Sequence, residues 1–127
     1  MSDAALNISP EAMTVYRTNA RRRWEQEQRD LDQRKARAWN IARQAAALLK
    51  DRFGAVRVVV FGSLIQANCF TRWSDVDVAA WGIATDETFY AIGAVLDLST
   101  DIEINLVDVT TCRPSLLATI EAEGIEL

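Results

Sequence analysis

Two aspartates one residue apart, following a glycine–serine pair, are the residues of this chain best suited to chemistry. Gly62 and Ser63 come directly after a short β-branched run, and Asp75 and Asp77 open the next apolar run. Residues two apart on a β-strand point to the same face, so the two carboxylates should lie side by side. Two like charges held that close are costly unless a cation lies between them. Oxygen clusters of this size suit Mg²⁺, which usually brings phosphate with it, so the pattern predicts a metal–phosphate site.

The Gly62-Ser63 pair suits the phosphate side of such a site. A glycine lets the backbone approach a phosphate closely, and a serine hydroxyl can donate a hydrogen bond to a phosphate oxygen. Mg²⁺ held by Asp75 and Asp77 would bridge a triphosphate and neutralise charge during displacement. Neither the Gly-Ser pair nor the Asp-x-Asp pair is specific alone. Both together, between two apolar strands, favour nucleotide chemistry.

The composition leaves carboxylates as the reactive groups. The chain has 127 residues, half apolar and a quarter charged, which is typical of one globular domain. It contains no histidine, which excludes Ser-His-Asp and Cys-His catalysis. Cys69 and Cys112 have no paired spacing and are expected to be free thiols in a cytoplasmic protein. No apolar run is long enough to span a bilayer, and the first residues lack the features of a signal peptide.

The charge is distributed unevenly along the chain. Residues 17–52 hold eleven basic and five acidic side chains, which gives this segment a net charge of +6. The net charge of the whole chain is −4, so the other residues together carry −10. This asymmetry indicates either a nucleic-acid or protein partner for the basic segment or an ordinary solvated helix face with acid–base pairs.

Periodicity and turn residues predict an α/β chain. A helix is expected over 10–53, in one piece or bent near residues 29–32, with Ser9 as its cap and Gly54 as its stop. The other predicted elements are strands over 56–61, 75–81 and 102–109, helices over 86–96 and 114–123, and a tail or edge strand at 125–127. The expected organisation is an N-terminal helical extension, 1–53, and a core, 54–127, within one compact unit.

From about residue 56 to its end, the chain resembles the minimal nucleotidyltransferases (MNT proteins) of the DNA polymerase β superfamily. Their signature is Phe-Gly-Ser, about ten residues, then Ser-Asp-x-Asp and an apolar residue; here it stands as Phe61-Gly62-Ser63 and Ser74-Asp75-Val76-Asp77-Val78. The resemblance implies a small mixed β-sheet of the polymerase β-like fold, flanked by helices. It also implies that Gly62, Ser63 and Ser74 bind the nucleotide and that Asp75 and Asp77 are catalytic metal ligands. Mg²⁺ would be the cofactor and ATP the substrate.

The chain departs from that family at the third carboxylate. Active members usually carry it on the neighbouring strand, and Asn105 occupies the matching position here. An asparagine cannot act as a base and offers a metal only a neutral ligand. Glu103 lies two residues earlier and faces the same way, so it is a candidate surrogate as well as a candidate surface acid. Asp108 has the opposite parity and should point away.

Stand-alone proteins of this size that resemble the family are often antitoxins, paired with a helical ribonuclease toxin of the HEPN class. There the antitoxin transfers AMP from ATP to a tyrosine of the toxin. The resemblance therefore implies an adenylyltransferase that forms a hetero-oligomer with a HEPN toxin in the cytoplasm, away from membranes. Two alternatives stay open. One is a degenerate protein that neutralises its toxin by binding alone, which Asn105 favours. The other is a transferase acting on a small molecule or nucleic acid, and the negative charge of the core speaks against nucleic acid.

Overall fold

The structure is a computed structural model that describes residues 8–127. The expectation that the first residues form no signal peptide falls outside this range. By contacts the chain divides into two compact units, one ending at Gln33 and one running from Arg34 to Leu127. The second unit contains the sheet and every candidate site residue. None of the helices described is long and apolar enough to cross a membrane.

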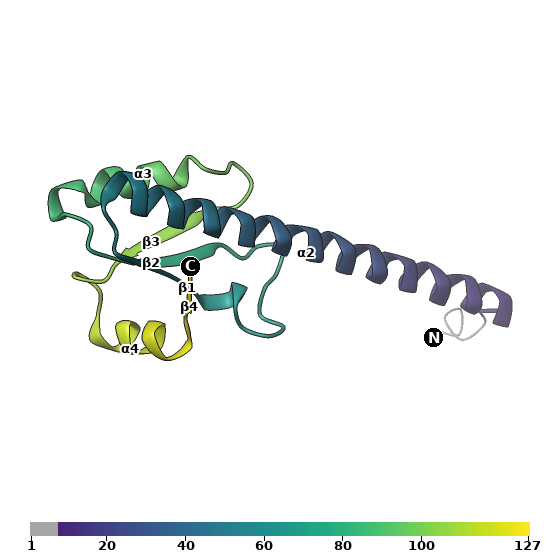
Figure 1. The fold of residues 1–127 in the computed structure, drawn as a ribbon. Coiled ribbons are helices and arrows are strands. Elements are labelled where there is room, and N and C mark those ends of the chain that lie inside the picture. The colour runs from purple at the N-terminus through teal and green to yellow at the C-terminus, as the bar shows by residue number, and fades with distance from the viewer. Residues whose placement is uncertain (1–7) are drawn as a thin grey trace, which may run out of the picture. The chain divides into compact units, whose positions relative to one another are not determined.

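Helix α2 (Pro10–Phe53) has the bounds that the sequence predicts and is unbroken near residues 29–32. Ser9 caps its start, since the Ala12 N–H donates to Ser9 Oγ over 3.1 Å. Gly54 ends it in the left-handed conformation, with φ +69°. All its buried residues lie within the second unit: Ala38, Ile41, Ala42, Ala45, Ala46 and Leu49. This stripe packs against the sheet (Figure 1).

The sheet has four strands in the order β3-β2-β1-β4 and is mixed, as predicted. Strand β1 (Arg57–Phe61) pairs antiparallel with β2 (Val76–Trp81) and with β4 (Ile125–Glu126). Strand β3 (Ile104–Asp108) pairs parallel with β2. A parallel pair needs a crossover, which the 3₁₀ turn η2 (Thr85–Glu87) and helix α3 (Thr88–Leu96) supply. The expected strand over 75–81 starts one residue later, which leaves Asp75 just outside the ladder.

Helices cover both faces of the sheet. The second-unit part of α2 and helix α3 lie on one face, and α4 (Pro114–Glu123) lies on the other (Figure 1). Because both faces are covered, the strands are apolar on both sides. Val59, Ala79, Val109 and Ile120 form the buried cluster under α4. Asp77 precedes Ala79 by two residues, so its side chain emerges at the end of the sheet on this face.

Asp108 is the buried charged residue of the core and takes no part in the candidate site. Its carboxylate accepts hydrogen bonds from the Thr88 hydroxyl at 2.8 Å and from the Thr110 N–H and hydroxyl at 3.0 and 2.8 Å. Burial alone would raise the pKa of Asp108, but the bonds from Thr110 and Thr88 outweigh it and hold the pKa below its ordinary value. Asp108 therefore ties the end of β3 to the start of α3, and the prediction that it points away from the site is confirmed.

Candidate metal and nucleotide site

The sheet brings the Gly-Ser turn, the second aspartate and Asn105 together on three adjacent strands. Phe61 and Asp77 are paired residues of β1 and β2, and Asp77 and Asn105 are paired residues of β2 and β3. Gly62 and Ser63 open the 3₁₀ turn η1 (Gly62–Leu64), which follows β1 directly. The candidate site thus has a Gly-Ser flank on the β1 side and an Asn105 flank on the β3 side.

Asn105 bridges the two aspartates through its amide nitrogen. Its Nδ2 lies 3.1 Å from Asp77 Oδ1 and 3.5 Å from Asp75 Oδ2, and it donates to both. Burial raises the pKa of Asp77 above its ordinary value; the hydrogen bond from Asn105 opposes this rise, and the charge of Asp75 adds to it. The Asn105 amide therefore offsets part of the repulsion that a cation would otherwise relieve.

Gly62 lies directly against the Asp77 carboxylate. Its φ is +80°, and a Cβ placed on it would lie 2.5 Å from Asp77 Oδ2. A side chain at this position is excluded twice, by the left-handed backbone and by the carboxylate. The contact shows that the Gly-Ser turn lies directly beside the second aspartate.

Gly62→Ala is expected to cost more stability than Gly54→Ala. Both glycines have positive φ, which costs alanine about 1 to 2 kcal/mol, but nothing lies within 4 Å of a Cβ at Gly54. Displacing Asp77 should add about 1 to 3 kcal/mol in Gly62→Ala. Urea unfolding of the two variants measures the difference. Equal losses would show that Asp77 moves away freely and that the close approach has no energetic consequence.

The donor set fits Mg²⁺ but offers only two carboxylates. Within residues 8–127 no group of three or more His, Cys, Asp or Glu side chains is arranged to hold a metal ion. Mg²⁺ is commonly held by one or two carboxylates together with substrate phosphates, so Asp75 and Asp77 satisfy that pattern. Half a turn of the Asn105 amide would present its oxygen as a neutral third donor.

Glu103 lies on the same side of the site as Asp75. The Val76 N–H donates to the Glu103 carbonyl over 2.9 Å, which continues the β2–β3 pairing one step beyond the strand. Asp75 and Glu103 both line a cavity of about 550 Å³, whose other lining residues include Arg34, Arg72 and Trp73. The Arg72 guanidinium lies 4.8 Å from the centre of the Trp73 ring at this cavity. Glu103 thus faces an open space next to the first aspartate.

The Ser74 hydroxyl shapes the turn that precedes Asp75. Ser74 Oγ accepts a hydrogen bond from the Thr71 N–H at 2.9 Å and lies 3.2 Å from the Thr71 hydroxyl. The Ser74 N–H donates in turn to the Thr71 carbonyl over 3.1 Å. This closed turn delivers the chain to Asp75, so the structure gives Ser74 a local structural part beside its expected nucleotide contact.

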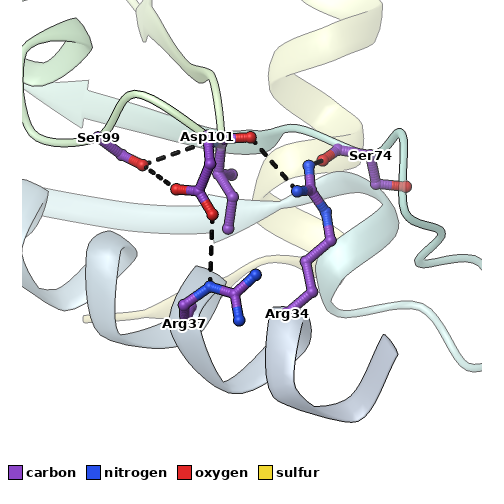
Figure 2. A network of polar contacts seen from close by, with 6 residues as sticks. Arg34, Arg37, Ser74, Ser99 and Asp101 are labelled. Carbon is purple, nitrogen blue, oxygen red and sulfur yellow. Dashed lines mark hydrogen bonds and ion pairs between the residues drawn. The ribbon is translucent and has the colours of Figure 1, made fainter. Parts of the chain in front are cut away.

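Sequence reasoning missed Arg34, which holds the loops that lead into the site. In Figure 2 its guanidinium reaches the carbonyls of Ser74 and Asp101, at 3.0 and 3.3 Å. The Asp101 carboxylate accepts from Ser99 Oγ at 2.8 Å and pairs with Arg37 at 3.4 Å. The only sequence signal was position, because Arg34 precedes the buried Ala38 by four residues and so belongs to the inward stripe of α2.

About two thirds of the chain is similar in fold to chains of solved toxin–antitoxin structures. One is a crystal structure of the toxin–antitoxin MntA-HpeT with a tyrosine-to-alanine substitution; the match has a TM-score of 0.55 and 21% identity over 67% of this chain and 69% of that chain. The second carries a double aspartate-to-glutamate substitution at positions two apart, with a TM-score of 0.55 and 18% identity over 67% and 70%. The chain has the nucleotidyltransferase fold. No family model and no curated protein matches the sequence.

Proposed function

We propose that this protein is an MNT-type antitoxin that transfers AMP from ATP to a tyrosine of a HEPN ribonuclease toxin. The observation that carries the proposal is the contact of Gly62 with Asp77, beside Asp75, in a chain with the fold of MntA. The residues that would bind phosphate and those that would bind metal meet there at one end of the sheet. The relation to toxin–antitoxin structures supports a toxin as the partner, in a hetero-oligomer to which α2 would contribute surface.

Each residue of the site has a part in such a transfer. Asp75 and Asp77 would hold Mg²⁺, which neutralises charge on the triphosphate. Gly62 and Ser63 would hold the β- and γ-phosphates, so that pyrophosphate leaves toward β1. The acceptor hydroxyl would then approach from the β3 side, where the cavity beside Asp75 lies. Its oxygen bonds to the α-phosphorus as the bond to pyrophosphate breaks, and Glu103 accepts its proton.

A second candidate function is toxin neutralisation by binding alone. The observation in its favour is Asn105, which donates to both aspartates where relatives carry a third carboxylate. With no base at that position, the site would bind a nucleotide without transferring it. Glu103 distinguishes the two functions, because it lines the cavity beside Asp75 and carries a carboxylate that could serve as the base.

Intact mass spectrometry of the partner tests the proposal. A candidate HEPN-class toxin is incubated with this chain, ATP and Mg²⁺. Mass increments of one AMP, lost in Glu103→Ala, would support transfer with Glu103 as the base. An unmodified partner that still forms a tight complex would support neutralisation by binding. Increments that persist in Glu103→Ala would assign the proton to another acceptor.

A further inference from the structure

Arg34 closes the end of the β2–β3 ladder at the candidate site. Ser74 lies immediately before Asp75, and Asp101 lies two residues before Glu103. The strands pair from Val76 and Ile104 onward, and the Glu103 carbonyl accepts the last backbone bond, from the Val76 N–H at 2.9 Å. The register of the two strands does not extend to the segments that precede Val76 and Glu103. The Arg34 guanidinium spans them instead, donating to the carbonyls of Ser74 and Asp101 (Figure 2).

This bridge uses the geometry that only arginine has. The guanidinium presents several N–H donors in a fixed plane, so it can hold two carbonyls at a set separation, whereas a lysine ammonium is a single point on a flexible stem. Arg34 Nε is buried and has no hydrogen-bond partner among residues 8–127. The two carbonyl bonds, together with the nearby negative charge of Asp101, therefore offset the desolvation of this cation.

Arg37 provides a natural contrast one turn later in α2. Its Nε pairs with the Asp101 carboxylate at 3.4 Å, and both side chains are about half exposed. Such an exposed pair contributes little to stability. Arg37 contacts the β3 side alone, while Arg34 contacts both sides of the site.

We propose that Arg34 is a positioning residue of the metal site. By fixing the Ser74 carbonyl against the Asp101 carbonyl, it sets the separation of Asp75 from the strand that carries Asn105. Groups that orient a metal ligand from behind commonly change metal affinity 10- to 100-fold when removed. The inference rests on the proposed role of Asp75 and Asp77 as metal ligands. It goes beyond that role because it assigns control of the distance between Asp75 and the strand of Asn105 to a helix outside the ladder.

The test compares Arg34→Met with Arg37→Met by NMR. Methionine keeps the apolar stem and removes the donors. The first readout, taken without metal, is the side-chain amide resonance of Asn105, with the exposed Asn40 as internal reference. In Arg34→Met the Asn105 signals are expected to move toward those of Asn40, while Arg37→Met leaves them in place. The second readout is the Mg²⁺ concentration that half-shifts the Asn105 amide, expected to rise about 10- to 100-fold in Arg34→Met alone.

The two readouts separate failure of this inference from failure of the proposed function. An unchanged Asn105 amide in a folded Arg34→Met protein would overturn the positioning role, whatever Mg²⁺ does. A wild-type protein that shows no Mg²⁺ response would instead overturn the metal site, and the amide shift would still decide on Arg34. If Arg34→Met does not fold, Arg34→Lys takes its place. It keeps the charge but reaches one carbonyl, so the same shift of Asn105 is expected, and a wild-type spectrum would refute the inference.

Discussion

Replacing Asp75 and Asp77 together with asparagine is expected to abolish AMP transfer and Mg²⁺-dependent nucleotide binding. Asparagine has the shape of aspartate without its charge, so the sheet should remain folded while the site loses its anionic metal ligands. A metal ion in such a site supplies several kcal/mol of charge stabilisation, and each 1.4 kcal/mol is a factor of ten in rate, so a loss of about 1,000-fold or more is expected. Radiolabel transfer from ATP to the partner measures the rate, and calorimetry measures binding.

Asp86→Asn is the matched control for this double variant. Asp86 is exposed in η2, which follows the opposite end of β2 from the site. Asp86→Asn makes the same type of substitution and removes one carboxylate charge without touching the Asp75–Asp77 pair, and wild-type transfer is expected. Retention of more than a tenth of the wild-type rate in the double variant would mean that the metal binds elsewhere.

Asn105→Asp is expected to raise the transfer rate about 100-fold, because an aspartate at the bridging position would be a better-placed general base than Glu103, and a correctly placed base contributes about 100- to 10,000-fold. The new carboxylate would lie where the Asn105 amide now bridges the aspartates, at 3.1 Å from Asp77. Three carboxylates then repel one another, so the metal-free variant should lose on the order of 1 kcal/mol of stability and regain it with Mg²⁺. Thermal unfolding with and without Mg²⁺ measures this effect.

Asn40→Asp provides the control for the added charge. Asn40 is exposed on α2, so an aspartate there should change neither transfer nor the Mg²⁺ dependence of unfolding. If Asn105→Asp remains inactive but gains Mg²⁺-dependent stability, loss of the third carboxylate is not the sole defect, and neutralisation by binding becomes the better account.

The sequence predicted the parts of the site that depend on local pattern. Gly62 could be placed because a Gly-Ser pair after a β-branched run predicts a turn, and Asp77 because strand periodicity fixes its face. The resemblance placed Asn105 on the strand next to the aspartates, and the register agrees, with Asp77 paired to Asn105. Arg34 could not be found in this way. Its partners lie 40 and 67 residues away, and no periodicity reports a contact between a helix side chain and two loop carbonyls.

The start of the strand that carries the aspartates was predicted less well than the face on which they lie. The strand carrying the aspartates begins at Val76, after Asp75, because the Ser74 turn and the Arg34 bridge occupy the positions where the ladder would have continued. Aspartate is depleted in strands, so only the alternation of Asp75 with Asp77 favoured strand at position 75, and the hydrogen bonds of the turn end the ladder one residue later. Asp75 therefore sits on a loop held by side chains, which explains why its placement depends on a residue that local pattern does not reveal.

The parallel pairing of β2 with β3 also sets the order in which the site can form during folding. Gly62 and Asp77 meet through an antiparallel hairpin of nearby segments, whereas Asn105 lies 28 residues from Asp77 and joins only after α3 has crossed over. Closing the longer loop costs more chain entropy before its contacts repay it, so parallel pairs form late. Amide hydrogens of β3 should accordingly exchange with solvent before those of β1. The site, which needs residues from β1, β2 and β3, should form as one of the last events of folding.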